Sequence, residues 1–124
     1  MRYSKMETMK SIEKILKKKG VESLEAMELN ESYTIQSQGY HELTIEKVGS
    51  DRLSVAHYYT QRGDLMRDPE IVFRIEENDS WTAVEYQQDD CGIYQHDKSG
   101  LDLSEFIKQW DENLGNQGFV GVVQ

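Results

Sequence analysis

The stretch from Ser54 to Ile75 holds the densest group of side chains that could do chemistry. Its pattern predicts a strand, a polar connection and a second strand, with carboxylates in and beside the connection. Hard divalent cations take oxygen ligands, and a short acidic connection can bring two or three carboxylates to one ion. The pattern therefore indicates a divalent cation as the one cofactor to test, with side chains of neighbouring strands completing the site. The candidate ligands are Asp64, Asp68, Glu70, Glu85 and His57.

Turn formation explains the same carboxylates without a metal. Asp64 follows Gly63, and an aspartate in such a position readily bonds its own backbone. Asp68 precedes Pro69, which favours an extended backbone at the residue before it. We therefore favour turn formation for these aspartates and keep the metal site as an alternative.

A metal-dependent nuclease is the sharpest form of the metal hypothesis. Such cores place an aspartate on one strand and a Glu-x-Lys sequence on the next, where the carboxylates hold Mg²⁺ and the lysine orients water. Here Asp68 or Glu70 would pair with residues 85–87, and Gln87 stands where the lysine is expected. A hydrolase or nuclease therefore stays as an alternative, and enzymatic activity is not the expectation.

His57 is a candidate general base, because it shares a strand face with Val55 and Tyr59 and is predicted to be partly buried. No serine or cysteine stands at a spacing that would complete a nucleophilic set. A lone histidine on an apolar strand face is more often a hydrogen-bonded core residue, so no catalytic residue is predicted. The single cysteine, Cys91, excludes an intramolecular disulfide.

A polar and aromatic sheet face is the other candidate site. Three tyrosines from three strands would share this face with polar side chains, and tyrosine is favoured at protein interfaces. The simpler explanation is an ordinary half-exposed sheet face with aromatic pairs across its strands. The candidate binding residues are Tyr58, Thr60, Arg74, Tyr86, Gln88 and Tyr94, joined by Asp64 and Arg67 of the connection.

The elements that position these residues follow from hydrophobic periodicity. A helix is predicted over residues 4–19, with capping-box spacing between Ser4 and Glu7, and the fold of residues 21–31 is left open. Alternation with short turns predicts about six antiparallel strands in order over residues 32–96. A second helix is predicted over residues 102–114, capped by Asp102 with its Phe106 and Trp110 face on the sheet.

The expected fold class is therefore α+β: an antiparallel meander with an N-terminal and a C-terminal helix packed on one face. The tail, residues 115–124, is expected to be an edge strand or loosely ordered. The chain of 124 residues has the length of a single domain spanning residues 1–124.

Charge is unevenly distributed along the chain. Residues 1–20 carry a net charge of +5, whereas the remaining 104 residues carry −14, which gives −9 overall. An acidic body disfavours nucleic acid as a partner. No apolar run is long enough to span a bilayer, and the N-terminus lacks the apolar core of a signal peptide. We therefore expect no membrane partner and a cytoplasmic location.

The sequence resembles an uncharacterised bacterial family, a domain of unknown function found mostly in small proteins of plasmids and other mobile elements. The most specific stretches are Val-Ala-His-Tyr-Tyr at 55–59 and Gly-Asp-Leu-Met-Arg-Asp-Pro-Glu at 63–70, with support from residues 39–46 and 86–95. The likeness covers roughly residues 20–96. It implies a compact cytoplasmic domain with mobile-element ancestry and implies no mechanism.

Three functions follow as hypotheses. The leading one is a non-enzymatic accessory module that binds a protein partner through the open sheet face and the 63–69 connection. The second is the metal-dependent hydrolase or nuclease described above. The third is an acidic inhibitor of a host defence or DNA-handling protein, which mimics nucleic-acid charge. The oligomeric state does not follow from the sequence.

Overall fold

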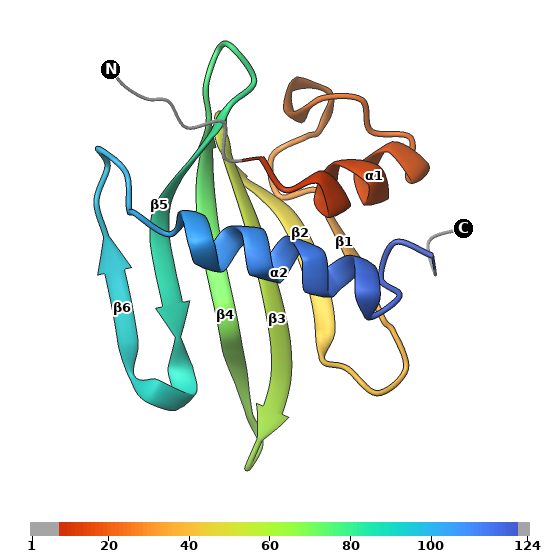
Figure 1. The fold of residues 1–124 in the computed structure, drawn as a ribbon, viewed down its shortest axis with the longest axis vertical. Helices are drawn as coiled ribbons and strands as arrows, with labels where there is room; N and C mark the ends of the chain where they lie inside the picture. The colour runs from red at the N-terminus through yellow and green to blue at the C-terminus, as the bar shows by residue number, and fades with distance from the viewer. Residues whose placement is uncertain (1–7, 122–124) are drawn as a thin grey trace.

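The computed structural model describes residues 8–121 and consists of one six-stranded sheet and two α-helices (Figure 1). The first helix and a 3₁₀ turn precede the sheet, and the second helix follows it. The helices are α1 (Lys10–Lys18) and α2 (Ser104–Asn116), with 3₁₀ turns η1 (Leu24–Ala26) and η2 (Asp89–Cys91). The strands are β1 (Ser32–Ile35), β2 (Glu42–Gly49), β3 (Arg52–Gln61), β4 (Asp64–Ile75), β5 (Trp81–Gln88) and β6 (Ile93–His96).

The sheet is an antiparallel meander with the strand order β1-β2-β3-β4-β5-β6, so each strand pairs with its neighbour in the sequence. This order confirms the expected topology. It arises because the short connections between the strands allow no crossover helix. Two of the longest strands, β3 and β4, form the centre of the sheet. Their hairpin turn has Arg62 and Gly63 at positive φ, a conformation that suits a tight hairpin.

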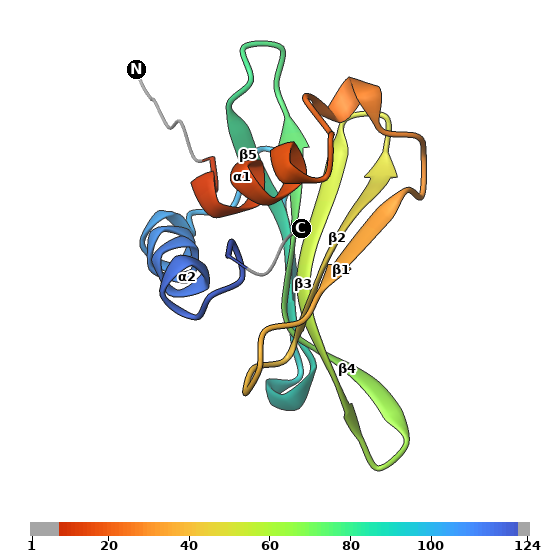
Figure 2. The same cartoon turned by 90° about the vertical axis from the view of Figure 1, so that its right-hand side faces the viewer.

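Both helices lie on the same face of the sheet, as the view in Figure 2 shows. Alternation along each strand turns the apolar side chains towards the helices. The centre of this core is fully buried and combines side chains of β2, β3 and β4 with those of both helices. Its members include Ile12, Ile15, Leu43, Ile45, Val55, Ile71, Phe73 and Leu114.

Helix α1 is shorter at its N-terminus than expected. It begins at Lys10, because Met9 has an extended backbone and provides no side-chain cap. The predicted capping pair at positions 4 and 7 lies outside the described residues. The backbone N–H of Ser11 donates to Oδ1 of Asp111 (2.8 Å), and its hydroxyl donates to the Asp111 carbonyl (2.9 Å). These bonds tie α1 to α2.

Residues 21–31, which the sequence left open, contain the η1 turn. Lys47 of β2 holds this turn, since its ammonium group donates to the carbonyls of Leu24 (3.1 Å) and Met27 (2.8 Å). Met27 is buried in the core. A buried ammonium group is costly without acceptors, and here the turn provides them.

Helix α2 starts two residues later than expected. Leu103, not Asp102, is its N-cap, and no side chain caps it, so the predicted cap is wrong. Trp110 is buried as expected, whereas Phe106 is 39% exposed and lies at the edge of the helix–sheet contact. The helix therefore packs mainly through Ile107, Trp110 and Leu114.

The tail folds back towards the helix-covered face of the sheet and forms no edge strand within the described residues. Its turn places Phe119 in the core with no exposed surface, 5.4 Å from the His57 ring and 6.2 Å from the Tyr40 ring. Gly118 precedes it at positive φ, which permits the sharp reversal. The last three residues, 122–124, lie outside the described residues.

Candidate functional site

The strand register sorts the candidate residues onto the two faces of the sheet. Tyr58 pairs with Arg67, Glu70 pairs with Gln87, and Gln87 pairs with Tyr94. Glu70 precedes the fully buried Ile71, so this series points away from the helices. We call the side opposite α1 and α2 the uncovered face, because no helix of residues 8–121 packs on it.

Tyr86 and Gln88 lie on the helix-covered side, contrary to the expectation. The Tyr86 ring meets Phe106 of α2 edge-on at a centroid distance of 5.7 Å, and its hydroxyl donates to the Gln88 side chain. A β-bulge is the reason: Phe73 pairs with Ala83 and Val72 with Glu85, so Val84 is an extra residue. The extra residue reverses the alternation after it and turns Tyr86 inward.

A hydrogen-bonded network holds Arg67 at the end of the uncovered face, beside the η2 turn. Asp89 accepts from the Arg67 backbone N–H (2.9 Å) and from its Nε (3.2 Å), while Gln87 donates to its other oxygen (2.9 Å). Glu70 lies 3.5 Å from Arg67 Nη1 and accepts a 2.6 Å bond from Ser54. The backbone N–H of Arg67 is the main reason that the pKa of Asp89 is lowered.

Two tyrosines flank this network. Tyr58 is half-buried, and burial raises its pKa. Tyr94 on the edge strand is 57% exposed, and its hydroxyl lies 3.1 Å from Glu85 Oε1, to which it donates. Arg74 shares the face near its other end, where its Nε donates to Glu76 (2.9 Å). The face thus combines fixed polar groups with exposed aromatic surface.

The β3–β4 hairpin continues beyond the rest of the sheet. The β2 pairing ends at Tyr58, and the β5 pairing begins at Glu70, so residues 59–66 form a two-stranded arm (Figure 2). Thr60 pairs with Leu65 near its tip, and Leu65 is 66% exposed. Asp64 lies at this tip, away from the other candidate ligands.

The structure divides the candidate metal ligands between the two faces. Glu70 and Glu85 lie on the uncovered face and take part in hydrogen bonds there, whereas His57 and Asp68 lie on the helix side. Among residues 8–121, no group of three or more His, Cys, Asp or Glu side chains is placed to hold a metal ion.

A groove of about 280 Å³ opens between α2 and the part of the sheet where His57 of β3 lies near Asp68 and Pro69 of β4. His57 forms part of its floor and is 9% exposed. Burial lowers the pKa of His57, against the smaller effect of the nearby carbonyls. We name this the α2 groove; it is lined by Tyr40, His41, His57, Asp68, Pro69, Phe106, Gln109, Trp110, Asn113 and Gln117.

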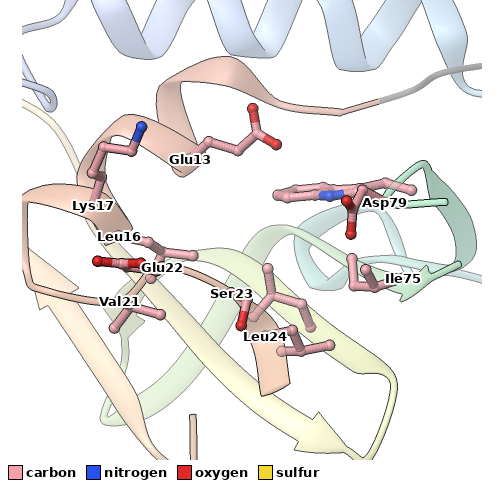
Figure 3. Close-up of a pocket in the computed structure, with 11 residues that line it drawn as sticks. Glu13, Leu16, Lys17, Val21, Glu22, Ser23, Leu24, Ile75 and Asp79 are labelled. Atoms are coloured by element: carbon pink, nitrogen blue, oxygen red, sulfur yellow. The ribbon is translucent and has the colours of Figure 1, made fainter. Parts of the chain in front are cut away.

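A second groove of about 360 Å³ lies beside α1, and Figure 3 shows its side chains. Glu13 and Lys17 extend from the helix, while Asp79 and Ile75 lie on the other side. Burial, followed by the charge of Asp111, raises the pKa of Glu13. The polar residues that line this α1 groove are all exposed, so it lacks the buried polar group that the α2 groove has.

Sequence reasoning missed two parts of these sites. Asp89, which fixes Arg67, follows strand β5 directly, and only its place in an acidic turn at the strand end could have indicated a role. His41 stacks on Tyr59 at a centroid distance of 4.7 Å and lines the α2 groove. His41 is exposed, and no pattern in the sequence around it indicated a role.

The model of one protein family, described as a domain of unknown function (DUF6908), matches residues 10–120. The match extends beyond the sheet to both helices. No curated protein and no solved structure matches the chain. Within residues 8–121, no helix is long and apolar enough to cross a membrane.

Proposed function

The chain belongs to the DUF6908 family, a domain of unknown function, and from this starting point we propose that it is a protein-binding domain without catalytic activity. The uncovered face of the sheet, with the adjoining β3–β4 arm, forms the binding surface, and the partner presents a basic surface. The observation that carries the proposal is the fixed position of Arg67 between Asp89 and Glu70, flanked by Tyr58 and Tyr94.

The fixed network favours binding because it reduces the cost of ordering side chains. An arginine loses side-chain freedom on forming an interface, at about 0.5–1.5 kcal/mol for each immobilised chain. Asp89 binds both the backbone and the side chain of Arg67, so most of this cost is met on folding. Arginine and tyrosine are also the residue types that most often dominate interface energies.

The charge of the uncovered face favours a basic partner. Residues 21–124 carry a net charge of −14, and strands β2 to β5 place several carboxylates on this face. Its arginines, in contrast, are already engaged with carboxylates of the same chain. A basic surface would be attracted at long range and would approach faster at low salt. The carboxylates of the strands are Glu42, Glu46, Glu70 and Glu85, and Asp89 of η2 joins them.

The arm adds an apolar contact to this polar surface. Leu65 and Tyr94 are among the most exposed large hydrophobic side chains of the described residues, at 66% and 57%. The edges of residues 59–66 are not paired with β2 or β5. Such edges can pair with an extended segment of a partner.

Site-specific photocrosslinking tests the proposal. We would place a photoreactive phenylalanine analogue at Tyr94 and, as a matched control on the helix side, at Lys14 of α1. The expected result in cells is a discrete adduct with a basic protein from position 94 and no such adduct from position 14. The adduct is then identified by mass spectrometry.

Charge reversal provides the control for this experiment. Glu85→Lys on the uncovered face should abolish the adduct from position 94, because it replaces a carboxylate that attracts the basic partner, whereas Glu112→Lys on α2 should leave the adduct unchanged. Both variants are first required to keep the melting temperature within a few degrees of the wild type. Equal adducts from positions 94 and 14, or an adduct that survives Glu85→Lys, would contradict the proposal.

The charge also favours inhibition of a DNA-handling protein as a second candidate function. A partner with a DNA-binding surface would be bound by the same carboxylates that repel nucleic acid. If this candidate is correct, double-stranded DNA should displace the purified partner from the domain. A partner that binds DNA and the domain at the same time would exclude it.

A further inference from the structure

The α2 groove lies on the opposite side of the sheet from the proposed protein-binding face and has a different chemistry. We propose that this groove binds a small organic cation, an ammonium or guanidinium group on an apolar or aromatic body. The inference is independent of the protein-binding function, because it concerns other residues on the other face.

The position of the ring proton on His57 favours a ligand that donates a hydrogen bond. Its Nδ1 lies 3.2 Å from the carbonyl oxygen of His41 and 3.3 Å from that of Glu42. Carbonyl oxygens only accept, so Nδ1 carries the proton and Nε2 of the neutral ring is an acceptor. No described residue donates to Nε2. An acceptor on a side chain that is about nine-tenths buried is thus left for a ligand that donates.

The charge of the groove favours a cation. Asp68 lies at its edge, where it accepts a hydrogen bond from the Gln88 side chain and interacts electrostatically with His57, His41 and Asp90. Burial, followed by the charge of Asp90, raises the pKa of Asp68. No lysine or arginine lines the groove, and Arg67, the residue before Asp68, points to the other face. A ligand cation would supply the missing positive charge.

The walls of the groove are aromatic. Trp110 and Phe106 of α2 lie with ring centroids 6.0 Å apart, and Trp110 also lies 5.6 Å from the His57 ring. Aromatic faces attract ammonium and guanidinium groups through their quadrupoles. Trp110 is 6% exposed, and its indole N–H is buried without an acceptor among the described residues. This N–H is a donor and does not attract a cation, so the wall contributes through its aromatic faces.

The size of the groove limits the ligand. Its volume of about 280 Å³ lies near the lower end of the roughly 300–1,000 Å³ typical of small-molecule sites. The floor and the α2 wall can enclose one ring or a short chain. Benzylammonium, with one aromatic ring and one ammonium group, matches both the size and the charge and is the probe we would use.

The two tryptophan indole resonances provide a direct readout. In a ¹H–¹⁵N spectrum of the full chain, Trp110 reports the α2 groove and Trp81, which lines the α1 groove, is an internal control. Trp110→Phe assigns the two signals. We expect benzylammonium to shift the Trp110 signal saturably and to leave the Trp81 signal in place. Benzyl alcohol and benzoate, which share the ring but lack the positive charge, should produce no saturable shift.

Charge variants test whether the carboxylate of Asp68 contributes to benzylammonium binding. Asp68→Asn should weaken benzylammonium binding by about tenfold or more, because it removes a charge-assisted contact. Asp64→Asn makes the same charge change at the arm tip and should leave the affinity unchanged. Asn113→Asp adds a carboxylate to the α2 wall and should tighten binding severalfold, which keeps the test open if Asp68→Asn does not fold.

Three results would overturn the proposal. The first is no saturable shift of the Trp110 signal at millimolar benzylammonium. The second is equal binding of benzyl alcohol, which would indicate a purely apolar groove. The third is an equal loss of affinity in Asp68→Asn and Asp64→Asn, which would indicate attraction to overall charge instead of a contact in the groove.

Discussion

The two faces of the central sheet differ in what their buried residues contribute. On the helix-covered face, large apolar side chains such as Val55, Ile71 and Phe73 are fully buried beneath α1 and α2. On the uncovered face, Ser54, Ala56 and Val72 are also nearly inaccessible, at 3%, 0% and 6%. They are small and are shielded by neighbouring polar side chains. One face therefore stabilises the fold by apolar burial, and the other presents a hydrogen-bonded polar surface.

This difference indicates where substitutions should affect stability and where they should affect recognition. Removal of a large side chain from the covered face leaves a cavity, which is costly because the core relaxes only in part. Removal of a side chain from the uncovered face costs a hydrogen bond or a partly screened ion pair. The predicted effects below decrease in this order.

Trp110→Ala should have the largest effect. Trp110 is 6% exposed and contacts the rings of His57 and Phe106, so its loss should reduce the free energy of unfolding by roughly 3–5 kcal/mol. Chemical denaturation with an unchanged m-value would measure this. An unchanged midpoint would contradict the packing of α2 on the sheet.

Asp89→Ala should have an intermediate effect, about 1–2 kcal/mol, because it leaves the Arg67 backbone N–H and the Gln87 amide without their acceptor. Asp64→Ala at the arm tip is the matched control and should change stability by less than about 0.5 kcal/mol. Equal melting temperatures for the two variants would mean that the network of the uncovered face contributes nothing to stability.

The pH dependence of stability should identify His57. Burial lowers the pKa of His57 from 6.5 in the folded chain, so the unfolded chain binds the proton more readily. The contribution is therefore fully present above pH 6.5 and is lost as the pH falls towards the folded pKa. His57→Gln should flatten this part of the stability–pH curve. His41 and Asp68 face His57 and remain in the variant, so an unchanged slope would assign it to them.

The order and direction of the strands could be predicted from the sequence because alternation and short turns are local signals. The bulge at Val84 could not, since one extra residue reverses the alternation without changing composition. It moved Tyr86 and Gln88 to the helix side. Tyr58 and Tyr94 lie on the uncovered face as expected, because Tyr58 alternates with the buried His57 in β3 and Tyr94 pairs with Gln87, which follows the bulge.

The helix ends and the tail depended on contacts that the sequence does not show. Helix α1 is held by Ser11 bonding to Asp111, one hundred residues away, and not by a local cap. Phe119 is buried beside the His57 ring, whereas the glycines around it suggested loose order. The α2 groove was missed for the same reason, since His57, Asp68 and Trp110 meet only after α2 folds back.

Tyr94→Ala should have the smallest effect on stability and a large one on recognition. Tyr94 is 57% exposed on an edge strand, and its hydroxyl donates a solvent-exposed hydrogen bond to Glu85. The free energy of unfolding should therefore fall by less than about 0.5 kcal/mol. An exposed tyrosine at the centre of an interface can nevertheless cost 2 kcal/mol or more of binding energy when truncated. Titration calorimetry with the crosslinked partner, once purified, would compare Tyr94→Ala with Tyr40→Ala, a tyrosine on the helix side that is 50% exposed. Weaker binding of Tyr94→Ala, with unchanged binding of Tyr40→Ala, would assign recognition to the uncovered face. Equal affinities of the two variants would mean that this face only shields the small residues beneath it.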